Sequence, residues 1–197
     1  MNWKCEVNTI NNELFLHEIK CEHSRLVSRI AGLLAKKSRF TDDEAMLIES
    51  AAVLHDVGKN YIPQSILLKP SKLTDYEYKI IQSHVSAGTD HILRNIRTLL
   101  AACIISLQHH ERPDGEGYAQ VTNIHEYAKI VAVADVFDAL IANNRPYKEA
   151  WAPEMAVLYM RENAKKQFEA EYITALLESV DEILELYYNN GQIIIAR

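Results

Sequence analysis

The sequence has little of what marks several large classes of protein. Its 197 residues include only 3 cysteines, 6 glycines and 5 prolines. The cysteines lie at positions 5, 21 and 103 and form no paired spacing, which argues against a disulfide framework and a thiolate metal site. No apolar run approaches the roughly 20 residues of a membrane span, and the first residues lack the apolar core of a signal peptide. We therefore expect a cytoplasmic protein that does not associate with a membrane.

Positive charge is also scarce. The chain has 21 lysines and arginines against 27 acidic residues, which gives a formal net charge of −6. This balance argues against a broad nucleic-acid-binding surface. It is compatible with a small phosphorylated ligand, because bound metal ions can supply positive charge locally. The length and the apolar share of 48% are typical of a globular protein, and we expect one domain spanning residues 1–197.

The apolar residues recur with a helical period along nearly the whole chain, which predicts an all-α fold of about eight to ten helices. We expect a first long helix over residues 11–37, and capping boxes at Thr41 and Thr74 predict the starts of two more. The second of these runs toward His84. Further helices are expected over 99–110 and 123–142, and two or three amphipathic ones over 153–188. The 123–142 segment is apolar nearly all round, so we interpret it as a central buried helix.

Several smaller features give predictions of their own. Gly58 is expected to end the helix before it in the left-handed conformation, and Gly88 either permits close helix packing or breaks a helix. His91 is interpreted as a surface or rim histidine. Asp138 is expected to make structural hydrogen bonds. The helices over 153–188 are expected to form a solvated outer layer and a candidate homodimer face, followed by a short extended tail at 191–195.

Imidazoles and carboxylates are placed inward, or at helix ends, on five of the expected helices. Each would need its own partner in a buried position, and metal ions satisfy all of them together. Mixed imidazole and carboxylate groups without thiolate suit Fe or Mn, and also Ni, Co or Zn, better than Ca or Mg. The set is too large for one ion with an open position and suits two ions. It consists of His23, His55, Asp56, His84, His109, His110 and Asp135.

These residues stand in motifs that resemble the HD superfamily of metal-dependent phosphohydrolases, and within it the HD-GYP cyclic di-GMP phosphodiesterases. The resemblance covers about residues 20–150 and leaves 151–197 as C-terminal helices and a short tail. In chain order the main motifs are His23-Ser24-Arg25, Leu54 to Lys59, Ile62 to Pro70, His84 with Gly88, His109 to Tyr118, and Ala134 to Leu140. The His55-Asp56 pair alone is a weak signal, whereas the last two motifs are highly specific.

The resemblance implies a role for each site residue. His23, His55, Asp56 and Asp135 would hold one ion, and Asp56 would bridge to a second ion held by His84, His109 and His110. Asp56 and Lys59 would be the catalytic residues, with Lys59 beside the scissile phosphate and a hydroxide that bridges the ions. The substrate-binding residues would be Lys59, Arg112, Tyr118, Arg145 and Lys148. The 111–122 loop would be a surface for a protein partner, such as a diguanylate cyclase domain.

Three departures from the family pattern bear on function. The tripeptide Gly-Tyr-Pro is here Gly117-Tyr118-Ala119, and losing the proline should free the loop backbone. The segment after Tyr118 is a few residues shorter than usual. Members with three metals carry a glutamate one turn before the first histidine, where this chain has Ile19, and Glu18 and Glu22 are expected to point elsewhere. Two metals are therefore expected rather than three.

The resemblance implies a phosphodiesterase that hydrolyses cyclic di-GMP to the linear dinucleotide, with further conversion to GMP less expected. The altered loop leaves two alternatives open. One is a phosphohydrolase for another nucleotide or another cyclic dinucleotide. The other is a cyclic-dinucleotide sensor or adaptor with little or no catalysis, although a binding module has no evident need of so many metal-type side chains.

Overall fold

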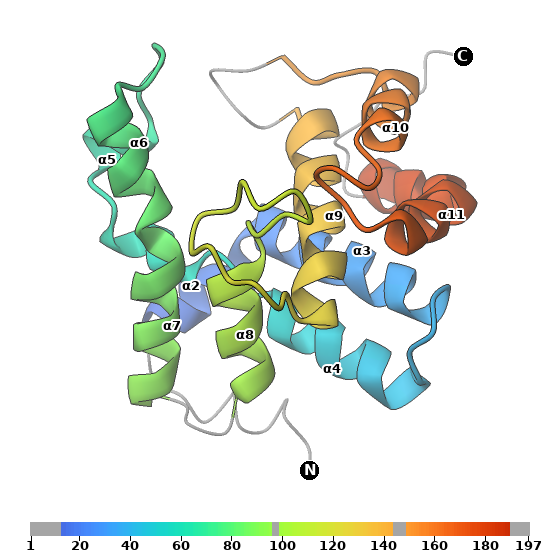
Figure 1. Cartoon of the computed structure of the whole chain (residues 1–197), viewed down its shortest axis with the longest axis horizontal. Helices are drawn as coiled ribbons and strands as arrows, with labels where there is room; N and C mark the ends of the chain where they lie inside the picture. Colours follow the sequence, from blue (N-terminus) through green and yellow to red (C-terminus); the bar gives the residue numbers. More distant parts are fainter. Residues whose placement is uncertain (1–12, 96–98, 144–148, 190–197) are drawn as a thin grey trace.

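In the computed structural model, which describes residues 13–95, 99–143 and 149–189, the chain is helical (Figure 1). The predicted all-α class is confirmed, and the described residues contain no strand beyond one isolated bridge between Ala164 and Phe168. The helices are α2 (Glu13–Lys20), α3 (Glu22–Lys36), α4 (Asp42–Ala52), the 3-10 helix η1 (Val57–Tyr61), α5 (Gln64–Leu67), α6 (Asp75–Gln82), α7 (His84–Asn95), α8 (Leu100–Gln108), α9 (Glu126–Ile141), α10 (Pro153–Glu162) and α11 (Ala170–Asn189).

Helix α9 is the centre of the molecule, as its apolar sequence predicts. Ile130, Val131, Val133 and Phe137 are fully buried, and α3, α8, α10 and α11 all pack against the helix. Figure 1 shows these neighbours around α9, with α10 and α11 on one side and α8 on the other. Burial on this scale contributes roughly 1.5–3 kcal/mol for each large apolar side chain. It also places Asp135 and Asp138, which α9 carries, inside the core.

The two predicted capping boxes are both present. The Thr41 hydroxyl accepts a hydrogen bond from the Glu44 amide, and the Thr74 hydroxyl accepts one from the Glu77 amide. Each glutamate carboxylate in turn accepts a hydrogen bond from the threonine amide, at 2.9 Å for Glu44 and 2.8 Å for Glu77. Since such boxes satisfy amides that a helix start leaves open, they fix where α4 and α6 begin.

The single long helix expected over 11–37 is a wrong prediction, because the chain breaks between α2 and α3. Cys21 takes an extended conformation, with φ −63° and ψ 124°. The break is accompanied by a buried contact of Glu18, whose carboxylate accepts hydrogen bonds from Ser24 Oγ at 2.7 Å and Asn60 Nδ2 at 3.2 Å. Helix α2 thereby packs against η1. No local breaker residue marks this point in the sequence.

The left-handed conformation expected for Gly58 is also wrong, since Gly115 is the only glycine among the described residues with a positive φ. Gly58 lies in η1, where an added Cβ would come within 1.9 Å of the His84 carbonyl oxygen. At Gly88 an added Cβ would meet Ser106 Oγ at 2.5 Å. Both glycines therefore let η1, α7 and α8 approach closely. Close helix packing was one of the two roles predicted for Gly88.

The surface position expected for His91 is a third correction. Helix α7 is continuous from His84, so His91 lies two turns further along the same helix. Its side chain is buried, and its Nδ1 is 2.5 Å from the Tyr61 hydroxyl. The contact comes from η1, which the sequence does not place against α7.

The C-terminal segment forms two amphipathic helices, α10 and α11, as predicted. Their acidic residues face outward, but Tyr172, Leu176 and Tyr187 of α11 are fully buried and complete the core. The expected tail at 191–195 lies outside the described residues. No described helix is long and apolar enough to cross a bilayer.

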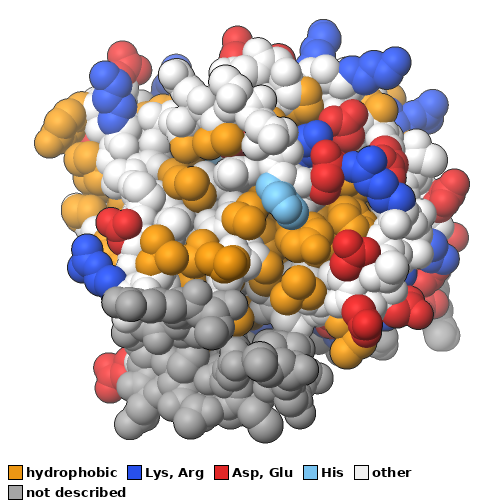
Figure 2. All heavy atoms as spheres, turned by 60° about the horizontal axis from the view of Figure 1, so that its bottom comes forward, with side chains coloured by type: hydrophobic (Ala, Val, Ile, Leu, Met, Phe, Trp, Pro, Cys, Tyr) orange, Lys and Arg blue, Asp and Glu red, His pale blue; other side chains and the backbone are white. Residues whose placement is uncertain are grey.

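One face of the molecule exposes many hydrophobic side chains around a single histidine (Figure 2). It is the lower side of Figure 1, where α4 and α8 lie. Large apolar residues exposed on these two helices include Met46, Leu47 and Leu100. Most of the predicted metal ligands, in contrast, are buried inside the bundle.

Candidate metal centre

The side chains predicted as metal ligands converge in two neighbouring clusters inside the bundle. The first ligand group is His23, His55 and Asp135, and the second ligand group is Asp56, His84, His109 and His110. Within each group the potential ligand atoms lie within 4.8 Å of one another. The family resemblance divides the other six residues between two ions in the same way and assigns Asp56 to both ions.

Five separate parts of the chain supply these residues. His23 lies in the first turn of α3 and Asp135 in the middle of α9. His55 and Asp56 follow the end of α4, in the turn that leads into η1. His84 opens α7, and His109 and His110 follow the end of α8. The close packing at Gly58 and Gly88 brings η1, which follows Asp56, against α7, which begins at His84.

Asp56 belongs to the second ligand group and also reaches the first, because one of its carboxylate oxygens is directed to each. Its Oδ2 is 3.5 Å from His23 Nε2 and 3.3 Å from His55 Nε2. Its Oδ1 is 3.3 Å from His84 Nε2 and 3.7 Å from His109 Nε2. A carboxylate in this position suits a bridge between two ions.

Four of the five imidazoles are held by their Nδ1 atoms. His55 donates to the Ala52 carbonyl at 2.9 Å and His84 to the Ile81 carbonyl at 2.7 Å. His109 Nδ1 lies 3.0 Å from the carbonyl oxygen of Ile105. His23 instead donates to the carboxylate of Asp138, at 2.6 Å. Because these partners only accept hydrogen bonds, each Nδ1 carries a proton, and each Nε2 is turned toward the ligand groups.

The buried atoms left without hydrogen-bond partners test whether metal ions fit here. They are Nε2 of His23, His55, His84 and His109, and Oδ1 of Asp56. Buried polar atoms of this kind are costly unless something satisfies them. Nitrogen lone pairs and carboxylate oxygens pointing at common centres are the ligands of divalent transition metals. The residues therefore fit such ions.

The local electrostatics keep Asp56 and Asp135 ionised and His110 neutral, the forms in which these three side chains bind cations. Burial alone would raise the pKa of Asp56, but the charges of Lys59 and His55 hold it well below its usual value. Burial would likewise raise the pKa of Asp135, and the adjacent imidazole of His23, whose Nε2 is 3.3 Å from Asp135 Oδ1, lowers it. Burial and the neighbouring His109 hold the pKa of His110 well below the usual value, so that this imidazole is neutral.

Of the residues predicted to bind substrate, three lie beside the ligand groups and two lie outside the described residues. Lys59 Nζ forms an ion pair with Asp56 Oδ2 at the edge of the centre, about a third exposed. Tyr118 stacks on His110, with ring centroids 4.4 Å apart, and Arg112 lies in the same recess of about 140 Å³ beside His109 and His110. Arg145 and Lys148 lie outside the described residues.

The loop that carries Tyr118 differs from what its sequence suggests. Without proline the Ala119 backbone was expected to be free, but the Ala119 amide donates to Glu111 Oε1 at 2.7 Å. No role was predicted for Glu111. The glutamate is buried, and no spacing rule connects it to an amide eight residues further on.

Asp138 makes the structural hydrogen bonds expected of it. Its Oδ2 accepts from His23, and its Oδ1 accepts from the Tyr187 hydroxyl at 2.6 Å. Tyr187 belongs to α11, so the C-terminal helix reaches the first ligand group through this carboxylate. Glu18, whose carboxylate is engaged by Ser24 and Asn60, belongs to neither ligand group.

Known proteins resemble this chain over most of its length. A family profile described as "HD domain" matches residues 8–172. The cyclic di-GMP phosphodiesterase response regulator RpfG of Xanthomonas campestris is 42% identical over 155 residues, which are 77% of this chain and 41% of the relative. The 3'3'-cGAMP-specific phosphodiesterase 2 of Vibrio cholerae is 39% identical over 168 residues, 83% of this chain and 32% of the relative.

Two further comparisons agree. A cyclic di-GMP phosphodiesterase of Thermotoga maritima is 36% identical over 169 residues, 84% of this chain and 46% of the relative. The solved structure of Bd1817, an HDG"Y"P protein from Bdellovibrio bacteriovorus, shares the fold with a TM-score of 0.67 at 20% identity, over 81% of this chain and 51% of that one. The chain thus spans less than half of the curated relatives named here. The family match covers most of its residues, so the chain belongs to the HD-domain family, and its motifs place it with the HD-GYP proteins.

Proposed function

We propose that this protein is a metal-dependent phosphodiesterase that hydrolyses a cyclic dinucleotide, with cyclic di-GMP as the first candidate and the linear dinucleotide as the product. The observation that carries the proposal is the convergence of two ligand groups whose inward nitrogen and oxygen atoms are buried without partners. A structural core has no need of such atoms, whereas a hydrolase that uses two metal ions requires them.

The first ligand group and Asp56 would hold one ion, and the second ligand group would hold the other. Iron or manganese suits this set best, and nickel, cobalt or zinc also fits imidazole with carboxylate. When bound, two such ions supply Lewis acidity for the phosphoryl oxygens and a nucleophile at neutral pH. Ile19 cannot ligate and Glu18 is engaged elsewhere, which supports two ions rather than three.

The chain's own residues would bind and orient the phosphate. Lys59 is held beside Asp56 and keeps a cationic head near the solvent edge, where it would stabilise the negative charge that builds up during hydrolysis. The guanidinium of Arg112 lies in the recess beside His110 and is paired with Asp114 at 2.5 Å. Tyr118 forms one wall of the same recess. Arg145 and Lys148 remain predicted phosphate contacts.

The substrate class is supported by what the relatives are named for. Two of the three relatives named above are cyclic di-GMP proteins, and the third is specific for 3'3'-cGAMP. The 3'3'-cGAMP relatives make that dinucleotide the second candidate. A protein partner for the 111–122 loop, such as a diguanylate cyclase domain, and a homodimer remain predictions.

The test measures metal content and turnover on one preparation. The protein is purified without chelator, its metals are counted by mass spectrometry, and product is followed from cyclic di-GMP, 3'3'-cGAMP and a mononucleotide panel with added Mn(II) or Fe(II). We expect about two transition-metal ions per chain and linear product from a cyclic dinucleotide. Asp56→Ala should lose metal and turnover together, because it removes the bridge.

Each alternative has its own result. Two ions with tight dinucleotide binding but no turnover would make the protein a sensor or adaptor. Hydrolysis of mononucleotides alone would make it a phosphohydrolase for another substrate. Absence of bound metal after reconstitution, or full activity in Asp56→Ala, would overturn the proposal.

A further inference from the structure

His110 is held differently from the other four imidazoles. Its ring nitrogens make no hydrogen bond to any part of the chain that the structure describes, whereas the other four donate from Nδ1. Ring contacts surround it instead. The Tyr118 ring lies 4.4 Å away and tilted by 34°, the His109 ring 4.1 Å away, and the His84 ring 5.2 Å away and nearly perpendicular. The orientation of His110 therefore depends on where Tyr118 lies.

Tyr118 is part of a loop between α8 and α9 and is held by few side-chain contacts. Its hydroxyl accepts a hydrogen bond from the Tyr78 hydroxyl at 3.2 Å, and the two rings meet edge to face at 5.9 Å. Tyr78 itself is well exposed. A weak contact to an exposed side chain does not fix a loop, so the backbone on either side of Tyr118 must supply the order.

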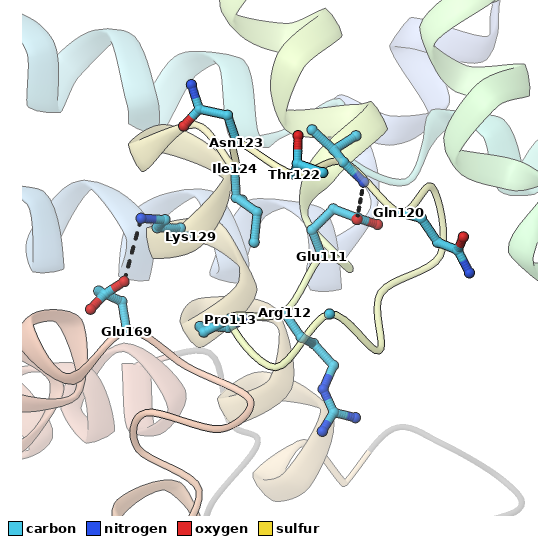
Figure 3. A pocket seen from close by; sticks show the side chains of 11 residues that line it. Glu111, Arg112, Pro113, Gln120, Thr122, Asn123, Ile124, Lys129 and Glu169 are labelled. Atoms are coloured by element: carbon cyan, nitrogen blue, oxygen red, sulfur yellow. Dashed lines mark hydrogen bonds and ion pairs between the residues drawn. The ribbon is translucent and has the colours of Figure 1, made fainter.

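Glu111 supplies it. The carboxylate is buried, and its two oxygens accept hydrogen bonds from two amides of the loop, Ala119 to Oε1 and Val121 to Oε2, both at 2.7 Å. Figure 3 shows Glu111 beneath the 120–124 segment with the bond to Oε2 drawn. The loop also passes close to Glu111 at Gly117, where an added Cβ would lie 2.7 Å from the glutamate.

One of these two bonds depends on a residue in which this chain departs from its family. Proline at position 119 would have no N–H, so Oε1 of Glu111 would lose its partner. Alanine supplies the donor. Hydrogen bonds to a charged acceptor are stronger than those between neutral groups, so a carboxylate that accepts two of them holds the loop firmly, as a clamp.

We propose that Glu111 is a positioning residue for the second ligand group, acting through the Ala119 and Val121 amides to hold Tyr118 against His110. The proposal rests on the proposed function only in that His110 is taken as a metal ligand. The clamp itself is a property of the metal-free chain, so the two can fail separately.

The first experiment measures hydrogen exchange on the metal-free protein by NMR or mass spectrometry. The Ala119 and Val121 amides should be the most protected of the 112–124 loop. Glu111→Gln leaves one acceptor oxygen and points an NH₂ group at the other amide, so exchange at both sites should accelerate about tenfold or more. Glu116→Gln is the matched control, because this exposed glutamate of the same loop reaches Arg112 only at 3.6 Å. Equal exchange in wild type and Glu111→Gln would overturn the clamp.

The second experiment combines Glu111→Gln with Ala119→Pro in a double-mutant cycle. The proline removes the bond to Oε1, so Glu111→Gln should accelerate exchange at Val121 less in the proline background than in wild type. Additive effects would overturn the dependence on the Ala119 amide. If Ala119→Pro does not fold, the wild-type protection of the Ala119 amide decides the same point.

The third experiment titrates metal-free protein with Mn(II) or Co(II) by calorimetry. Glu111→Gln should weaken binding of one ion about tenfold and leave the other unchanged, as expected when support for one ligand is lost. Loss of both ions to the same extent, or of neither, would overturn the link from Glu111 to His110. Turnover is not measured, so an inactive protein would still give an answer.

Discussion

Among the described residues, Asp138 is the one carboxylate that accepts a hydrogen bond from the Nδ1 of a ligand histidine. Its oxygens accept from His23 Nδ1 and the Tyr187 hydroxyl, both at 2.6 Å. The other supported histidines donate to neutral carbonyls. Asp138→Asn keeps the shape but offers one acceptor to two donors, so we expect about 10–100-fold weaker binding of one metal ion. Calorimetric titration of the metal-free variant and wild type with Mn(II) measures this affinity.

Tyr187→Phe is the matched control for this change. It removes the hydroxyl from Asp138 but leaves the hydrogen bond to His23, so the loss of metal affinity should be smaller. The prediction is contradicted if both variants weaken binding equally, or if Asp138→Asn binds both ions as tightly as the wild type.

Gly58 shows how little space separates η1 from α7. An alanine Cβ there would come within 1.9 Å of the His84 carbonyl oxygen and 2.6 Å of the Gly88 amide nitrogen, and neither is a side chain that can rotate away. We expect Gly58→Ala to lower the free energy of unfolding by about 3 kcal/mol or more, at the upper end of overpacking costs. Denaturant unfolding of the metal-free protein measures it.

Gly115→Ala gives the comparison for Gly58. Nothing lies within 4 Å of an added Cβ there, and the only cost is the backbone at φ +82°. That strain is worth about 1–2 kcal/mol. A larger loss at Gly115 than at Gly58 would mean that the close approach of η1 and α7 is not the limiting contact.

At the scale of one element, the start of α6 carries a pH dependence. The hydrogen bond from Lys69, followed by the one from the Thr74 amide, lowers the pKa of Glu77 to about 2 from 4.5. A lowered pKa means that the ionised glutamate stabilises the fold above about pH 4.5, and that this contribution is lost as the pH falls toward 2. Glu77→Gln should therefore be less stable than wild type at pH 7, with the difference shrinking below pH 4.5.

Thermal unfolding of both proteins between pH 7 and pH 3 checks this prediction. Comparing two variants cancels the titration of the other carboxylates. Lys69→Met serves as the control, because it keeps the capping box and removes the first-named cause of the shift. A difference that stays constant down to pH 3 would show that the charge of Glu77 does not matter.

The elements that could be predicted from sequence are those with local causes. The capping boxes at Thr41 and Thr74 need only residues three apart, and the apolar sequence of α9 needs only one helix. The break at Cys21 and the burial of His91 could not be predicted, because both depend on contacts with η1. Gly58 was expected to be needed for a left-handed backbone conformation, whereas glycine is required there because the backbone of α7 lies so close.

In the candidate site, too, features with a local mark in the sequence could be predicted, and features that depend on distant contacts could not. The two ligand groups could be predicted because their members are unusual residue types for buried helix ends and stand in specific motifs. The clamp of Glu111 could not, because its partners are backbone amides, which leave no mark in a sequence. The part played by Tyr187 was missed because α11 lies beyond the segment that resembles the family.

At the scale of the whole molecule, the two ligand groups join distant parts of the chain. They draw on α3, the turn before η1, α7, the end of α8, and α9. Without metal, this centre holds buried nitrogen and oxygen atoms that lack hydrogen-bond partners. Since such atoms oppose folding, an ion that binds them only in the folded state must stabilise the entire bundle.

The last prediction follows from that linkage. Free Mn(II) at about 100 times its dissociation constant should add about 2.7 kcal/mol for each ion bound, which corresponds to a rise of about 5–10 °C in melting temperature for a chain of this size. Ca(II) should give little or no rise, because it prefers oxygen ligands and each group contains imidazoles. Asp56→Ala should show a much smaller rise than wild type, since one carboxylate serves both groups. Equal shifts with Mn(II) and Ca(II), or an undiminished shift in Asp56→Ala, would show that the ions bind at the acidic surface and that the buried atoms do not act as a metal centre.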